Sequence, residues 1–82
     1  MSLVLLYDSD DVAVATRPMR VGEPLALPGV SGTALRDDVP AGHKVALRDL
    51  APGSPVRKYG QVIGRALAQV RAGEHVHTHN LG

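Results

Sequence analysis

The chain has 82 residues, no cysteine and a formal net charge of +1 at pH 7. Without thiols, a disulfide framework and a thiolate metal site are both excluded, and a reducing cytoplasm fits best. The basic residues are scattered, which argues against a nucleic-acid surface. Because a domain this small buries only about 60% of its unfolded surface, we expect one domain over residues 1–82 with a thin aliphatic core.

Short apolar runs separated by turn residues predict a mainly β fold. The first run, Leu3–Tyr7, is too short to span a membrane and lacks the features of a signal peptide, so we predict the first strand there. Six prolines and nine glycines leave no room for long helices. We expect a small domain of short strands with one or two short helical turns. The other predicted strands are Val12–Thr16, Val45–Leu47, Pro55–Tyr59, Gln61–Ala66 and His75–His79.

A repeated unit accounts for three of the turns between these strands. The stretches "VATRPMRVGEPL", "VALRDLAPGSPV" and "RALAQVRAGEHV" share an alanine, an apolar residue four positions on, a glycine three further on, and then an aliphatic residue. A strand, a turn with an inward apolar residue, a glycine with positive φ and a second strand would produce this pattern. The shared positions are Ala15, Met19, Gly22 and Leu25; Ala46, Leu50, Gly53 and Val56; and Ala66, Val70, Gly73 and Val76.

The histidines gather at the C-terminal end, in "GEHVHTHN". Side chains at alternate positions of a strand share one face, so a regular strand would place His75, His77 and His79 together. Two imidazoles spaced in this way can bind one metal ion. A solvated edge strand and an imidazole acid or base are the alternatives. His43, in "PAGHKVAL", could approach the same end of the domain.

A second polar group lies at "VRKYGQVIGRA", where Lys58 and Tyr59 precede Gly60. Lys58 could bind a carboxylate and Tyr59 could hydrogen-bond a hydroxyl group. The alternative is a hairpin bend with a solvated lysine and a tyrosine that caps the core.

Taken together and in this order, "GHKVALRD", "KYGQVIGRA" and "GEHVHTHN" resemble the SAF domain, a β-clip fold, of the altronate and galactarate dehydratases. The likeness covers nearly the whole chain. It implies a hydro-lyase that removes water from a sugar acid or a related 2-hydroxy acid by metal-assisted β-elimination, giving a 2-keto-3-deoxy product. The short chain is similar to the separate small subunits of split altronate dehydratases and sulfolactate sulfo-lyases.

The resemblance also implies site residues and partners. The family pattern of glycine, valine, two histidines and asparagine falls on Gly73, Val76, His77, His79 and Asn80. The expected ion is iron(II) or manganese, with zinc as an alternative. The expected partners are a separately encoded large catalytic subunit and the sugar acid, with no nucleic acid or membrane, and the isolated chain is expected to form a homo-oligomer. We predict catalytic roles for His77, His79 and Lys58, substrate binding by His43, Lys44, Tyr59 and Asn80, and metal binding by His75, His77 and His79.

Two other functions stay open on the sequence alone. The first is a sulfo-lyase small subunit that releases sulfite from sulfolactate. The second is a non-catalytic SAF-type module that binds a carbohydrate or a protein, because a fold by itself does not determine function. The histidine motif favours an enzyme, since a pure adaptor would not need it.

Overall fold

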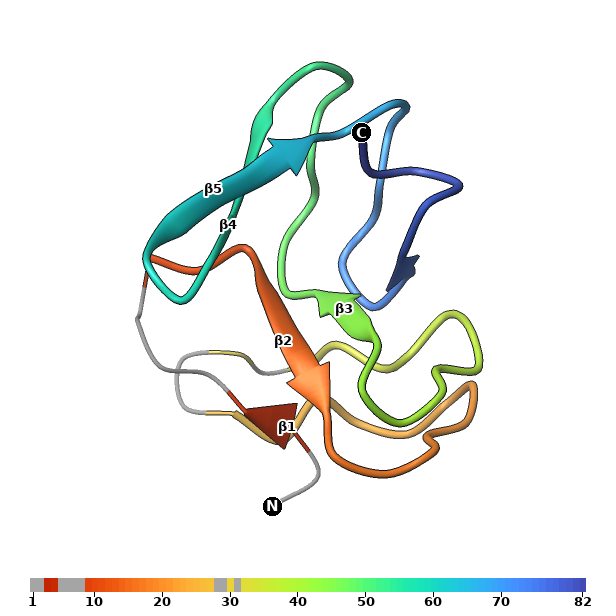
Figure 1. The fold of residues 1–82 in the computed structure, drawn as a ribbon. Helices are drawn as coiled ribbons and strands as arrows, with labels where there is room; N and C mark the ends of the chain where they lie inside the picture. The colour runs from red at the N-terminus through yellow and green to blue at the C-terminus, as the bar shows by residue number, and fades with distance from the viewer. Residues whose placement is uncertain (1–2, 5–8, 28–29, 31) are drawn as a thin grey trace.

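The computed structural model describes residues 3–4, 9–27, 30 and 32–82. Six strands make up the regular structure (Figure 1). They are β1 (Leu3–Val4), β2 (Val12–Ala15), β3 (Lys44–Ala46), β4 (Pro55–Lys58), β5 (Gln61–Arg65) and β6 (His75–Val76). The mainly β class is therefore confirmed. Where one or two helical turns were expected, the described residues contain β-type turns and no helix.

The strands form a four-stranded antiparallel sheet in the order β1-β2-β3-β6 and a separate hairpin of β4 and β5. The four middle strands lie within one residue of their predicted bounds. Part of the first predicted strand, Leu3–Tyr7, lies outside the described residues. The last prediction, a strand over His75–His79, is wrong beyond Val76, because residues 77–80 form a turn.

The predicted turn unit is confirmed at all three positions. Gly22, Gly53 and Gly73 have φ angles of 92°, 80° and 91°, and the apolar residues assigned to the unit are all buried. The structure adds a fourth copy around Gly42, whose φ is 83°. The sequence comparison misses this copy because Leu35 stands where the other three have alanine.

The four units associate in two pairs through their backbones. Met19 and Val39 exchange two N–H···O bonds of 2.8 Å, and Leu50 and Val70 exchange bonds of 2.7 and 2.9 Å. Each turn glycine also donates to the first residue of the opposite unit, as Gly73 does to the Ala46 carbonyl at 2.8 Å. The turns therefore satisfy their own polar groups and need no regular sheet around them.

Two hydrophobic clusters lie on opposite sides of the β2–β3 ribbon. Ala13 and Val45 are register partners and belong to the first cluster, while the partners Val12 and Ala46 belong to the second. All four side chains are at most 1% exposed. Both clusters therefore pack against this ribbon, one on each face. This explains why Val12–Ala15 and Val45–Leu47 are continuous apolar runs rather than alternating ones.

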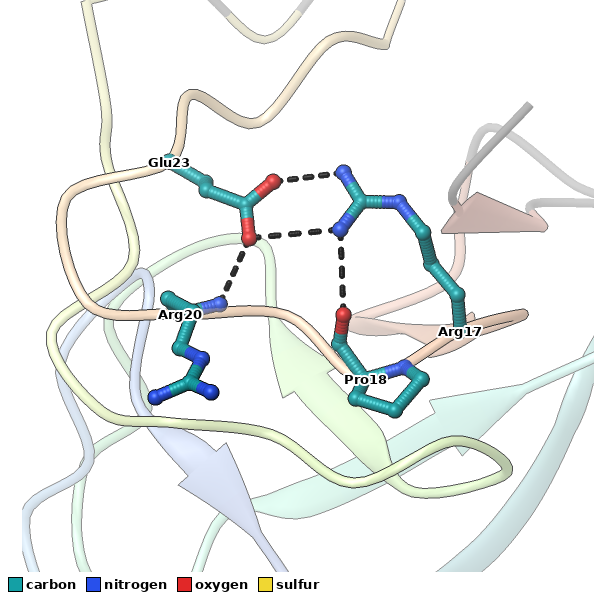
Figure 2. Close-up of polar contacts among 4 residues, drawn as sticks. All are labelled: Arg17, Pro18, Arg20 and Glu23. Atoms are coloured by element: carbon teal, nitrogen blue, oxygen red, sulfur yellow. Dashed lines mark hydrogen bonds and ion pairs between the residues drawn. The ribbon is translucent and has the colours of Figure 1, made fainter.

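An ion pair and a backbone hydrogen bond stabilise the exposed side of the first turn. Figure 2 shows the Arg17 guanidinium group donating to both carboxylate oxygens of Glu23, which also accepts from the Arg20 backbone N–H. The hydrogen bond from Arg17 is the main reason that the pKa of Glu23 lies below its ordinary value. The group is exposed, so we expect its contribution to stability to be small.

Candidate metal site

Three imidazoles from two segments meet at the end of the β2–β3 ribbon. His43 follows the Gly42 turn and precedes β3, whereas His75 begins β6 and His77 follows it. Because β3 and β6 are antiparallel with Val45 opposite His75, residues 32 positions apart become neighbours. Nδ1 of His43 lies 2.9 Å from Nε2 of His75, and one ring nitrogen from each of the three histidines lies within 4.8 Å of the others.

The His77 ring stacks on those of His43 and His75, which are tilted by 31° to each other with centroids 5.1 Å apart. Ring centroids of His43 and His77 are 4.3 Å apart with an interplanar angle of 24°, and those of His75 and His77 are 5.5 Å apart at 11°. His79 lies beside this group, with its ring centroid 5.5 Å from that of His75, but it is not in the set of converging nitrogens. The structure thus brings His43 together with two of the three histidines predicted to bind metal.

Asn80 shapes the segment that carries His75 and His77. Its side chain is buried; Oδ1 accepts from the His77 N–H and Nδ2 donates to the His75 carbonyl, both at 2.9 Å. The Leu81 N–H also donates to the His77 carbonyl at 2.9 Å. These contacts close the turn that ends β6, so the side chain predicted to bind substrate is engaged with the backbone of its own segment.

Burial and mutual repulsion lower the pKa of two of these imidazoles, those of His75 and His77. The pKa of His75 is lowered chiefly by burial and then by His43, His79 and His77, while Asp37 acts in the opposite direction. For His77, burial again lowers the pKa most, followed by His43 and Lys44. A neutral imidazole offers the lone pair that a metal ion needs. The site is therefore suited to a cation at neutral pH.

Two lysines, Lys44 next to His43 in the chain and Lys58 at the end of β4, lie close enough to interact with each other. Burial lowers the pKa of Lys44, and the charge of Lys58 lowers it further. Lys58 ends β4, and its Nζ lies 5.0 Å from the centre of the Tyr59 ring. A pair of nearby ammonium groups can bind an anion such as a carboxylate, which agrees with the type of ligand expected from the sequence.

Two carboxylates that sequence reasoning did not assign hold these parts in place. Asp37 Oδ2 accepts from the His75 backbone N–H at 2.9 Å. Asp10, which is fully buried, accepts from the backbone N–H groups of Tyr59 and Gly60 at 2.7 and 2.8 Å. Asp10 thereby fixes the β4–β5 turn next to Lys58. Asp10 and Asp37 each lie in a short polar stretch that resembles an ordinary loop. The sequence therefore does not indicate their long-range contacts.

Residues 1–82 match the family described as the altronate/galactarate dehydratase SAF domain. The chain belongs to this family. It is 45% identical over 80 residues to an altronate dehydratase of Escherichia coli, covering 98% of this chain and 16% of that protein. An altronate dehydratase of Bacillus subtilis is 38% identical over 79 residues, covering 96% and 16%.

A (2R)-sulfolactate sulfo-lyase subunit alpha of Chromohalobacter salexigens is 51% identical over 47 residues, covering 57% of this SAF domain and 50% of that subunit. The chain thus spans about a sixth of the dehydratases it matches. In the part of the chain that the structure describes, no helix has the length and apolar character needed to cross a bilayer.

Proposed function

We propose that this SAF domain is the small component of a hydro-lyase and acts with a separately encoded, larger catalytic chain. The observation that carries the proposal is the cluster of His43, His75 and His77 in a chain of a dehydratase family. The name subunit alpha in the related sulfo-lyases supports a two-chain arrangement. Since the matching region is 16% of each altronate dehydratase, most of the machinery of those enzymes lies outside it.

The imidazole cluster fits a divalent ion. Nitrogen donors without thiolates suit iron(II) or manganese, with zinc as an alternative. Nδ1 of His43 and Nε2 of His75 are 2.9 Å apart and hydrogen-bonded, so an ion held by both would replace the proton between them. His43, His75 and His77 would hold the ion. When bound, it would supply Lewis acidity that stabilises negative charge developing on the substrate.

The remaining polar groups suit dehydration of a sugar acid. Lys44 and Lys58 bind the carboxylate, and Tyr59 hydrogen-bonds a hydroxyl group. His79, which lies beside the cluster, removes the C2 proton, and the electrons of that C–H bond form the C2–C3 double bond as the C3 hydroxyl leaves. The hydroxyl departs as water with the proton from His79, and the enol becomes a 2-keto-3-deoxy acid.

The sulfolactate sulfo-lyases support a second candidate reaction. Their subunit alpha is 51% identical to this chain over 43 to 47 residues in two organisms. In that reaction the C3–S bond breaks in place of the C3–O bond, and sulfite leaves with the bonding electrons. The same lysines and histidines would serve both reactions, so substrate assays distinguish them.

Metal titration tests the cluster directly. Calorimetric titration of the 82-residue chain with manganese(II) or iron(II) under anaerobic conditions should show one site. We expect His43→Ala to weaken binding by more than roughly tenfold, because loss of a ligand should cost at least as much as loss of an outer-sphere partner. His79→Ala is the matched control and should bind as the unmodified chain does. Equal affinities for the two variants would refute this ligand set.

A chimeric enzyme tests the reaction. The matching 80 residues of the Escherichia coli altronate dehydratase are replaced by this chain, and 2-keto acid is measured with altronate, galactarate and sulfolactate in turn. We expect activity with one of them, and His77→Ala and His79→Ala should each reduce kcat by at least about 100-fold. Thr78→Ala, an exposed change between them, is the control. Full activity of the same enzyme with the SAF region deleted would refute the proposal.

A further inference from the structure

β5 carries aliphatic side chains that are exposed to solvent. Val62 is 50% exposed and Ile63 is 38% exposed, and no residue of the strand is buried. Its partner strand β4, in contrast, buries Val56 completely. Along Gln61–Ile63, β5 pairs only with β4 among the described residues. The strand thus places β-branched aliphatic side chains where they support neither hydrophobic cluster.

Exposed apolar side chains are concentrated on this hairpin. Five large hydrophobic residues are exposed in the described part of the chain, and four of them lie between residues 59 and 67. These four, Tyr59, Val62, Ile63 and Leu67, are called the β5 patch here. The fifth, Val21, is in the first turn. Several exposed apolar side chains within one short stretch of a small domain are typical of a protein-binding surface.

The charge around the β5 patch has one sign. Between Asp49 and Glu74 the sequence has four basic residues and no acidic one. Two carboxylates approach the hairpin from outside this stretch, and both are engaged: Asp10 is buried against the β4–β5 turn, and Asp11 accepts from the Arg57 N–H and pairs with Arg48. The side-chain charge of this stretch is therefore positive, from the exposed Arg57 and Arg65 and the half-buried Lys58.

The β5 patch is held by fixed backbone contacts. Arg65 and Gly82 exchange two backbone hydrogen bonds of 2.8 and 2.9 Å, and Leu67 donates to the Asn80 carbonyl at 3.0 Å. Gly64 permits this approach, because a Cβ there would lie 2.3 Å from the Gly82 oxygen. The chain segment that ends in these contacts at Asn80 and Gly82 also carries His75 and His77. Lys58 lies at the turn of the β4–β5 hairpin. The patch is thus joined by backbone hydrogen bonds to the segment that follows His75 and His77 in the chain.

We propose that the β5 patch is the docking surface for the catalytic chain, which meets it with aliphatic residues bordered by carboxylates. This inference rests on the proposed function, because that function requires a larger partner. Charge complementarity identifies the partner surface as acidic. Docking there would leave the side chains of His43, His75 and His77 out of the main contact.

Amide hydrogen exchange in the chimera described above tests the docking surface. We expect the amides of residues 61–63 to exchange at least roughly tenfold more slowly in the chimera than in the isolated 82-residue chain. Replacing both Val62 and Ile63 with glutamate should remove this protection, because glutamate would face carboxylates. Both residues are exposed, so the melting temperature of the isolated double variant should stay unchanged. Val21→Glu, at an equally exposed valine, is the matched control and should keep the protection.

The outcomes separate this inference from the proposed function. Equal exchange rates in the chimera and the isolated chain would overturn the docking proposal even if the chimera were active. Slow exchange in the isolated chain that grows with its concentration would also overturn it, because a second copy would then be the occupant. Protection in an inactive chimera would support docking while refuting the proposed reaction.

Discussion

The Asn80 carboxamide provides the most direct test of how the histidine segment is held. Asn80→Ala removes an acceptor for the His77 N–H and a donor to the His75 carbonyl, each at 2.9 Å. The side chain is 6% exposed, so water cannot freely replace it. A buried polar group that loses its partner costs about 1 to 3 kcal/mol, and relaxation of the turn lowers the sum for the two groups to about 2 to 4 kcal/mol.

This loss is large for a domain of this size. The free energy of unfolding of an 82-residue domain is about 4 to 12 kcal/mol, and each kcal/mol corresponds to roughly 4 to 8 °C in melting temperature. Urea unfolding followed by far-UV circular dichroism measures the difference. Thr78→Ala, in the same turn but exposed, should change stability by less than about 0.5 kcal/mol. If Asn80→Ala and Thr78→Ala unfold at the same urea concentration, the assigned role of the carboxamide is wrong.

Three further predictions concern the rest of the domain. Asp10→Ala should lower the free energy of unfolding by about 3 kcal/mol in urea titrations, because two N–H groups of the β4–β5 turn lose their buried acceptor. Gly53→Ala should lower the free energy of unfolding by about 1 to 2 kcal/mol because of its positive φ alone. Gly73→Ala should lower it clearly more, since its Cβ would also lie 2.4 Å from a backbone oxygen. Calorimetric melts of the two variants measure this difference. Thermal melts without metal should show stability falling as the pH drops below about 6.5. Folding lowers the pKa of His75 and His77, so the unfolded chain takes up protons before the folded chain does. The stability that is present above that pH is therefore lost as the pH falls. No loss of melting temperature between pH 7.5 and 5.5 would contradict this last prediction.

Local features of the sequence were sufficient to predict the four middle strands and three of the four turns. The glycine of each repeated unit marks a position that needs positive φ, and its apolar neighbours mark the core, so Gly22, Gly53 and Gly73 were assigned correctly. The fourth unit follows the same physics, but Leu35 in place of alanine hides it from a comparison of letters. The family resemblance, by contrast, depended on three motifs in order and not on any one of these units.

Long-range register is what the sequence could not supply. The alternation of His75, His77 and His79 suggested one strand, but a hydrogen bond from His77 to Asn80 ends that strand early. His43 was expected near this end of the domain but as a substrate-binding residue, because its place in the cluster depends on the pairing of β3 with β6. Asp37 was left out for the same reason, since its contact with the His75 N–H spans 38 residues.

The candidate site lies at the end of a ribbon that is buried on both faces. Val12, Ala13, Val45 and Ala46 of this ribbon are at most 1% exposed. His43 immediately precedes β3 at its edge. Groups that must converge on one ion need fixed backbones, and this ribbon provides one for His43. The stretch from residue 59 to 67 supports neither cluster with large side chains, so it can contact a partner without weakening the support of the histidines.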